Sequence, residues 1–483
     1  FSDKKIIREV IKKRKLHLKK SYYQDSLLNL ALKKKNIKNI KYEGVSINTK
    51  TIKKNDIFFC IKGKKNDGHN FAKEAIKRGA LRLIISKKIK KLPNSRFIKV
   101  KNTFSSLNSL AQTTRDNSSA QIIGITGSVG KTTLKNLIGF ILKNYGKTYH
   151  SPFSYNNKFG VPLSLFNLKI NDRFGVFEVG MDKKGEIDNL TKIIKPDLGI
   201  ITNISYAHSK NFKDIKQIAN AKAEIMNNIK KDGTIVLNKD DSFFDHHEKI
   251  ALNKNLKIIS FGIKNKSSKI KLTRIKKVKN KYELIINVNG KSFSFFSNND
   301  NKSNLYNILA TLASINNFLD IKILKKNIFM NLKTPTGRGD ISKIKFKNKK
   351  IFLVDETYNS NPLSLQTAIQ NFDKIESKNS KKYMILGDML ELGKHSIKQH
   401  KIMSKVVNKT QINKVYVIGK YIKETFKGLK TSKKEKILKS NFEIINLINK
   451  NLDNNDYLMI KGSNSTGLHK LAKILKQRNS HAL

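Results

Sequence analysis

The sequence has a single cysteine and no long apolar run, and these two features bear on disulfide bonding and on membrane insertion. One cysteine excludes an internal disulfide, and because Cys60 lies in the apolar stretch 57–61, we expect an inert thiol packed in a core. No apolar run approaches the ~20 residues of a membrane-spanning helix, and the basic segment 1–20 lacks the apolar core of a signal peptide. We therefore expect a cytoplasmic protein without a membrane span.

Acidic residues are scarce as well. The chain has 36 aspartates and glutamates and 98 lysines and arginines, which gives a formal net charge of +62. Such a charge is compatible with nucleic-acid binding and attracts anionic substrates. The excess is mostly lysine, however, and it is spread along the whole chain among asparagine and isoleucine. We interpret it as a solvated basic surface and expect no nucleic-acid partner, but a nucleic-acid-binding P-loop ATPase stays open as an alternative.

The most informative stretch that is present runs from residue 121 to 142. Apolar residues suited to a strand lead into a Gly/Ser/Thr turn, and a helix-like run follows Lys131 and Thr132. Backbone amides of such a turn, with the helix N-terminus, can hold phosphates, while the lysine reaches the β/γ-phosphates and the threonine hydroxyl holds Mg²⁺. The candidate ATP-binding residues here are Gly127, Ser128, Val129, Gly130, Lys131, Thr132 and Thr133.

This motif departs from the usual phosphate loop, because Ile125 stands where the first glycine belongs. The actual pattern, Thr-Gly-Ser-x-Gly-Lys-Thr-Thr, is the short form found in ATP-dependent amide ligases of the Mur and folylpolyglutamate type.

Strands alternate with helices along most of the chain, which predicts an α/β fold with parallel sheets covered on both faces. At 483 residues we expect several domains, and composition separates the regions 1–116, 117–334 and 335–483, with a Pro/Gly linker at 335–339. The expected strands are 57–61, 83–85, 97–100, 175–179, 198–202, 234–237, 351–354, 383–386, 414–418 and 457–460. The expected helices are 71–78, 107–114, 215–230, 362–372, 398–407 and 467–475.

Two further segments of the central region have their own signatures. Residues 270–296 predict a β-hairpin-like insertion, with turns at 279–280 and 289–290. The Lys/Asn-rich stretch 253–269 predicts a solvated loop.

Three side chains after the phosphate loop suit metal and phosphate chemistry. Glu178 ends an apolar strand, where ligands of parallel sheets bind, and its carboxylate could ligate Mg²⁺. His208 follows the next apolar strand, although a single histidine is more often structural. Lys222 could direct positive charge at a phosphate or, after reaction with CO₂, supply a carboxylate ligand, and the residues themselves leave this choice open.

Further strings make the chain resemble the Mur ligase family. They are Thr126–Thr133, Tyr155–Leu163, Glu178–Met181, Gly185–Ile187, Ile201–Ile204, Ala207–His208, Ala221–Glu224, Asn304–Asn307, Gly337–Gly339, Asp355–Pro362, Gly387–Gly393 and Lys461–Ser463, with Phe58–Gly63, Asp67–His69 and Lys77–Ala80 nearer the N-terminus. The resemblance implies a central P-loop-type parallel-sheet ATPase domain, a smaller N-terminal α/β domain that binds a UDP-sugar, and a C-terminal Rossmann-like α/β domain that binds the incoming amine.

The resemblance also assigns roles to residues. It implies ATP and two Mg²⁺ as cofactors, with Lys131, His208 and Lys222 as catalytic residues and Lys222 carbamylated. The implied metal ligands are Thr132, Glu178, His208 and Lys222. The implied adenine, ribose and phosphate contacts beyond the loop are Asn307, Arg338, Asp355, Tyr358 and Asn359. The implied substrate contacts are Asn156, Asn157 and Lys461.

Four positions depart from the pattern of the family: Asn48, Lys50, Ser303 and Asn464. The first two affect the expected recognition of uridine diphosphate, and the last affects contacts to the amine substrate.

Within the family, the Gly387–Gly393 string and its companions favour a monomeric enzyme that joins D-alanyl-D-alanine to UDP-N-acetylmuramoyl-tripeptide through an acyl phosphate, in peptidoglycan synthesis. A sibling ligase that adds a single amino acid, or glutamate to a folate, stays open as an alternative.

Overall fold

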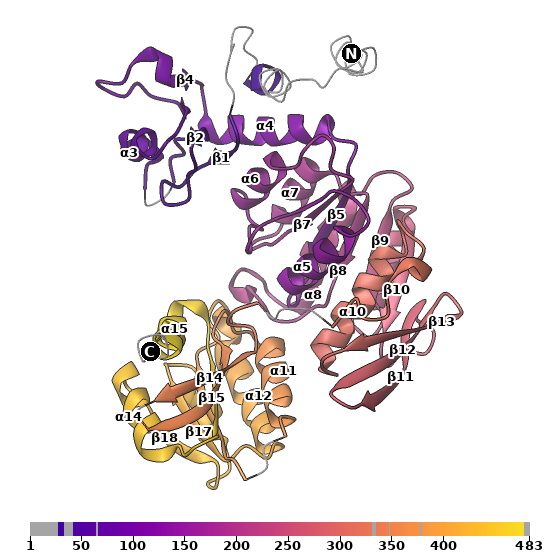
Figure 1. Cartoon of the computed structure of the whole chain (residues 1–483), viewed down its shortest axis with the longest axis vertical. Helices are drawn as coiled ribbons and strands as arrows, with labels where there is room; N and C mark the ends of the chain where they lie inside the picture. The colour runs from indigo at the N-terminus through magenta and orange to yellow at the C-terminus, as the bar shows by residue number, and fades with distance from the viewer. Residues whose placement is uncertain are drawn as a thin grey trace.

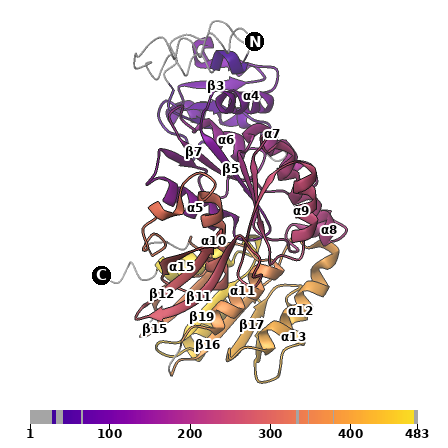
Figure 2. The ribbon, with the colours of Figure 1, turned by 90° about the vertical axis from the view of Figure 1, so that its right-hand side faces the viewer.

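The computed structural model describes residues 28–32, 42–63, 66–330, 335–346, 348–376 and 379–477; the segment 1–20 and part of the first region lie outside them. Three sheets follow one another along the chain, which confirms the expected α/β class and three-domain architecture. Figure 1 shows the N-terminal sheet at the top, the central sheet below it, and the C-terminal sheet at the bottom beside the strands β11–β13. A quarter turn shows the same stacking along the long axis (Figure 2).

The N-terminal sheet is parallel, in the order β1-β2-β3-β4. Its elements are β1 Val45–Ser46, β2 Ile57–Phe59, α3 Ala72–Lys77, β3 Arg82–Ile85, β4 Phe97–Lys99 and α4 Thr103–Asp116. Cys60, just after β2, is fully buried, and burial raises the pKa of its thiol to about 12, which confirms the expected inert core cysteine. The buried Arg115 of α4 donates to Ile194 O at 2.7 Å and so joins this domain to the next.

The central sheet has nine strands in the order β13-β12-β11-β10-β9-β8-β5-β7-β6. Its strands are β5 Gln121–Thr126, β6 Thr148–His150, β7 Phe174–Glu178, β8 Leu198–Ile201, β9 Thr234–Asn238, β10 Lys257–Gly262, β11 Ile270–Val278, β12 Lys281–Val288 and β13 Lys291–Ser297. Strands β5 to β11 pair in parallel, and β11, β12 and β13 pair antiparallel.

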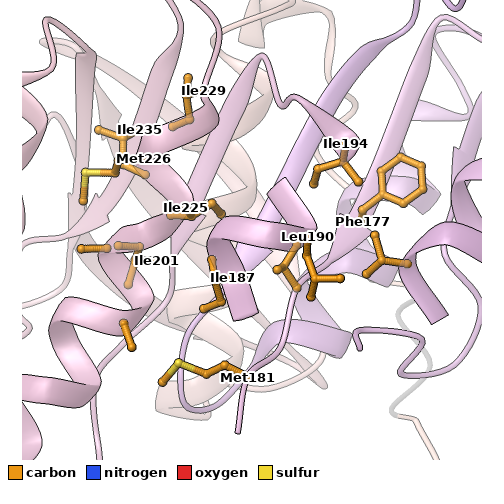
Figure 3. Packing of buried hydrophobic residues seen from close by; sticks show 14 of the residues in the cluster. Phe177, Met181, Ile187, Leu190, Ile194, Ile201, Ile225, Met226, Ile229 and Ile235 are labelled. Atoms are coloured by element: carbon orange, nitrogen blue, oxygen red, sulfur yellow. The ribbon is translucent and has the colours of Figure 1, made fainter. Parts of the chain in front are cut away.

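Helices cover both faces of this sheet because its strands are apolar on both sides. On β5, Ile122 enters one hydrophobic cluster and Ile123 the other, as the two-residue repeat of a strand requires. One face carries α5 Lys131–Leu142 and α10 Lys302–Ile315; the other carries α6 Gly160–Phe166, α7 Glu186–Ile194, α8 Ile215–Ala223 and α9 Phe244–Asn253. Figure 3 shows the second face, where Ile187, Leu190 and Ile225 pack together.

Three expectations for the central domain are corrected. The stretch 253–269 is not only a solvated loop, because it contains β10, whose Phe261 is fully buried in the hydrophobic core. The insertion 270–296 has its two turns where expected, but it forms three strands that extend the central sheet. The helix expected at 215–230 ends at Ala223 and continues as a 3-10 segment, Glu224–Asn228.

The C-terminal sheet has the order β14-β15-β19-β16-β17-β18, parallel except for the edge strand β14. Its elements are β14 Asp340–Phe346, β15 Lys349–Glu356, α11 Pro362–Asp373, β16 Lys382–Gly387, α12 Ser396–Asn408, β17 Lys414–Ile418, α13 Lys423–Lys427, β18 Lys434–Ile437, α14 Asn441–Asn451, β19 Tyr457–Lys461 and α15 Leu468–Gln477. Within the described ranges, every helix is too short or too polar to cross a bilayer.

Candidate active site

The expected strand–loop–helix lies at the carboxyl end of the central sheet. β5 ends at Thr126 and α5 begins at Lys131, with Gly127 (φ +138°) and Gly130 (φ +90°) between them in left-handed conformations. A Cβ at Gly127 would collide with the Thr202 hydroxyl, so only glycine fits this turn. The N-terminus of α5 therefore opens at the strand ends, where its first amides and partial positive charge can hold a phosphate.

Two amides of the loop already have acceptors within the protein. Ser128 N donates to Asn203 O at 2.9 Å, and Val129 N donates to Asn203 Oδ1 at 2.9 Å. Phosphate binding by backbone groups therefore falls to the first amides of α5, while Ser128 and Val129 fix the shape of the loop.

Two lysines, the half-buried Lys131 and the buried Lys222, meet at one carbonyl oxygen of this loop. Lys131 Nζ donates to Gly127 O at 2.8 Å, and Lys222 Nζ donates to the same oxygen at 3.0 Å. Burial lowers the pKa of Lys131, which the carboxylate of Glu178 partly offsets. Burial, helped by the positive Lys131, lowers the pKa of Lys222 well below its ordinary value. Of the two pKa values, that of Lys222 is therefore displaced further toward the neutral amine, while Glu178 favours the ammonium form of Lys131.

Oxygen donors gather beside these lysines. Thr132 Oγ1 donates to Glu178 Oε2 at 2.7 Å, and Asn156 Nδ2 donates to Glu178 Oε1 at 2.7 Å. Glu178 is almost completely buried, at 1% exposure. Because Mg²⁺ prefers oxygen ligands and binds through one or two carboxylates plus substrate phosphates, the side-chain oxygens of Thr132 and Glu178 suit such an ion.

Glu178→Gln tests this assignment. The amide has the shape of the carboxylate but not its charge, so we expect the Mg²⁺ concentration for half-maximal ADP release to rise roughly 10- to 100-fold, with normal folding. The measurement is a Mg²⁺ titration of ADP release, with Glu435→Gln on the exposed edge strand β18 as the matched control. An unchanged Mg²⁺ requirement would contradict the role of Glu178.

The C-terminal domain reaches directly into this cluster. Arg338 Nη2 donates to Thr132 Oγ1 at 3.1 Å, and the Tyr358 hydroxyl lies 2.6 Å from Ser154 Oγ. The Arg338 guanidinium lies 4.0 Å from the centre of the Tyr358 ring, a cation–π contact that orients both side chains. Ser154 Oγ also lies 3.1 Å from Thr132 Oγ1, so the two domains meet at the Thr132 hydroxyl.

A third buried lysine supports the loop that carries Ser154. Lys135, one turn beyond Lys131 in α5, is fully buried and donates to Ser151 O and, at 2.6 Å, to Phe153 O. Phe153 is left-handed (φ +46°) and leaves its ring 80% exposed. Burial lowers the pKa of Lys135 to about 8. This side chain fixes the path of residues 151–154 rather than facing the strand ends.

His208 lies at the second contact between the same domains. Its Nδ1 is 2.6 Å from Glu391 Oε2 of the C-terminal domain and 3.1 Å from Asp182 Oδ1. The two carboxylates, Asp182 first, raise the pKa of His208. The three side chains could hold a cation together, and Lys210 N, which donates to Glu391 O at 2.9 Å, adds a backbone link between the domains.

Many of these groups border one cavity of about 960 Å³ between the central and C-terminal domains. A cavity of this size accepts a nucleotide and the reacting end of a second substrate. The predicted site residues that line it are Ser128, Val129, Gly130, Lys131, Thr132, Thr133, Asn156, Glu178, His208, Asn307, Arg338, Tyr358, Asn359 and Lys461.

Comparison with known proteins agrees with this architecture. Three family models match in chain order: the catalytic domain of the Mur ligase family over residues 41–114, the Mur ligase middle domain over 125–315, and the Mur ligase glutamate ligase domain over 343–464. UDP-N-acetylmuramoyl-tripeptide–D-alanyl-D-alanine ligase of Rickettsia prowazekii is 30% identical over 453 residues, which cover 93% of this chain and 98% of that protein. The chain belongs to the Mur ligase family.

Solved structures support the fold of this Mur ligase over its whole length. MurF from Acinetobacter baumannii superposes with a TM-score of 0.81 at 24% identity, covering 94% of this chain and 98% of that one. MurF from Thermotoga maritima, solved in complex with ADP, superposes with a TM-score of 0.76 at 24% identity, covering 92% of this chain and all of that one.

The structure places a few predicted residues of this Mur ligase away from the cavity lining. Asn157 Oδ1 accepts Phe159 N and Gly160 N, and so caps the start of α6. Gly127, at the start of the loop, and Lys222, which donates to Gly127 O, are not among the residues that line the cavity. Asp355 is buried on the other side of β15, where its carboxylate binds Lys476.

Sequence reasoning missed Glu356, which borders the cavity where Asp355 does not. Successive residues of a strand point to opposite faces, so Val354 and Glu356 face the cavity together, and this alternation was the available signal. Glu356 Oε2 lies 3.2 Å from the buried Lys461 Nζ, which also donates to Asn359 O at 3.0 Å.

The positions that depart from the family pattern lie in turns or at the cavity edge. Asn48 Oδ1 accepts Lys50 N at 3.0 Å within a turn of the N-terminal domain. Ser303 borders the cavity, and Asn464 begins a short 3-10 segment after Ser463.

Proposed function

We propose that this Mur ligase joins D-alanyl-D-alanine to UDP-N-acetylmuramoyl-tripeptide, with ATP converted to ADP and phosphate, in peptidoglycan precursor synthesis. The observation that carries the proposal is the cluster of Lys131, Thr132 and Glu178 at the parallel strand ends, in a chain that matches such a ligase along nearly all of its length. ATP use follows from the family, since Mur ligases depend on ATP.

The chemistry begins with a carboxylate, which is a poor electrophile until it is phosphorylated. Transfer of the γ-phosphoryl group onto it makes an acyl phosphate and concentrates negative charge near Lys131, which offers an ammonium, and the amides at the start of α5. Bound Mg²⁺, held through Thr132 and Glu178, would neutralise part of this charge. Arg338 lies against the same hydroxyl and adds a third positive group from the C-terminal domain.

The second step joins the amine to the activated acid. The amine nitrogen attacks the acyl carbon, the C–O bond to phosphate breaks, and phosphate leaves as the amide forms. Water must be excluded, because it would hydrolyse the acyl phosphate. The contacts of Arg338 with Thr132, Tyr358 with Ser154, and His208 with Glu391 hold the two domains together around the cavity where this occurs.

We assign the three domains to the three ligands. Residues 1–116 hold the UDP-sugar, 117–334 hold ATP, and 335–483 hold the incoming amine. Asn307, Tyr358 and Asn359 lie on the adenine side of the cavity, and Asn156 and Lys461 on the side of the peptide substrates. A second Mg²⁺ is held with the help of His208 and a carbamylated Lys222, and the enzyme acts as a cytoplasmic monomer.

Release of ADP from ATP, measured with UDP-N-acetylmuramoyl-tripeptide in the presence and absence of D-alanyl-D-alanine, tests the proposal. We expect sustained turnover only with both peptide substrates, because the acyl phosphate formed without the amine blocks further turnover. Mass spectrometry should show the tripeptide extended by two alanines.

The alternatives predict different results in the same assay. A sibling ligase would turn over with a single amino acid in place of the dipeptide, or with a folate and glutamate. A nucleic-acid-dependent ATPase would be stimulated by DNA or RNA and would ignore both peptides. Either result would replace the proposed function.

A further inference from the structure

The loop that carries Arg338 is held by a lysine from the last described helix. Arg338 lies between Gly337 (φ +76°) and Gly339 (φ +95°), in the segment that joins the central and C-terminal domains. Two left-handed glycines make this segment intrinsically free to take other paths, so something must select the path that brings Arg338 to Thr132.

The backbone amides of the two glycines donate hydrogen bonds to two aspartates. Gly337 N donates to Asp340 Oδ1 at 2.5 Å, and Gly339 N donates to Asp355 O at 2.8 Å. Asp340 and Asp355 are direct cross-strand partners at the end of the β14–β15 ladder. Their carboxylates therefore lie side by side, and like charges in such a pair repel.

Lys476 of α15 lies against both carboxylates. Its Nζ donates to Asp340 Oδ2 at 2.6 Å and to Asp355 Oδ2 at 2.5 Å, and only 20% of its side chain is exposed. Its position in the last turn of α15 also places the positive charge at the favourable end of that helix. One ammonium thus cancels the repulsion of the two acids that anchor the loop.

We propose that Lys476 is a positioning residue for Arg338: it holds Asp340 and Asp355 together and thereby fixes the 335–339 loop from which Arg338 reaches the ATP site. Asp355 acts here through the loop, from the far side of β15, rather than through a contact with ATP. The inference rests on the proposed function, because it assumes that Arg338 acts on ATP during the reaction.

A double-mutant cycle between Lys476→Met and Arg338→Ala tests this, with kcat and KM for ATP from ADP release. We expect Arg338→Ala to lower kcat/KM roughly 100-fold, because it removes one positive group from the phosphates. Lys476→Met should lower it about tenfold through misplacement of Arg338, and Lys476→Arg should recover most of the loss. In the Arg338→Ala background, Lys476→Met should cost less than about twofold, which marks the two residues as one unit.

Controls separate the possible outcomes. Lys473→Met, on an exposed position of the same helix, should match the unmodified enzyme. If Lys476→Met does not fold, Lys476→Gln replaces it in the cycle, since its amide keeps a hydrogen-bond donor but removes the positive charge between the two carboxylates. An equal loss with and without Arg338, or no loss at all, would overturn the inference. An unchanged activity of Arg338→Ala would instead overturn the proposed role of Arg338 itself.

Discussion

Lys131→Ala should abolish ADP release, with a loss of roughly 1,000-fold or more in kcat/KM for ATP. The reason is local: Lys131 lies at the start of α5 beside the phosphate loop, and the Glu178 carboxylate favours its charged form against the opposing effect of burial on its pKa. Alanine leaves the developing charge on the transferred phosphoryl group without this partner.

The control for this prediction is Lys147→Ala, which removes an exposed lysine of the same domain and should leave turnover unchanged. Thermal unfolding of both variants should stay close to that of the unmodified protein, because Lys131 is buried at a cost that its removal relieves. Retention of more than a tenth of the activity in Lys131→Ala would contradict the assignment of the ATP site.

Lys222→Ala should lower turnover by a similarly large factor, roughly 100-fold or more, if the residue works as a carbamate. Lys222 is buried, and burial lowers its pKa well below the ordinary value, which favours the neutral amine that can attack CO₂. The new N–C bond forms as one proton leaves, and the product is an anion beside Lys131. A carboxylate there suits both the ammonium and a metal ion better than a second amine.

Charge variants distinguish the carbamate from a plain lysine. Lys222→Glu should retain more activity than Lys222→Ala, whereas Lys222→Arg should be as inactive as the alanine variant. Labelling with ¹³C-bicarbonate should give one carbamate resonance that Lys222→Ala lacks and that Lys216→Ala, an exposed control on α8, retains. Activity in the arginine variant but not in the glutamate variant would contradict the carbamate.

Local sequence patterns were enough to predict many helices and strands of this protein. The strand–loop–helix at 121–142 was predicted because a glycine turn between an apolar strand and a helix has few other structures. The expected position of β17 matches the structure at both ends. The pattern was insufficient for β10, because the lysines and asparagines on both sides of its short apolar run are typical of a solvated loop.

Residue roles were harder to predict where a side chain's direction decides them. Asp355 and Glu356 are adjacent acids in one string, and only the pleat of β15 shows that Glu356 faces the cavity while Asp355 faces Lys476. No sequence pattern indicated the structural role of Lys135, since its hydrogen-bond partners are carbonyl oxygens of a loop more than fifteen residues away.

The sequence by itself determined the α/β class, the phosphate loop and the set of acids and lysines that chemistry on ATP requires, because these depend on periodicity and on residue type within short segments. Only the tertiary structure decided that Arg338 meets Thr132, that Lys131 and Lys222 share one carbonyl oxygen, and that Lys476 anchors the linker. The contacts of Lys222, Lys476 and Arg338 join residues from 95 to over 200 positions apart, and packing of whole domains, rather than any local preference, brings them together.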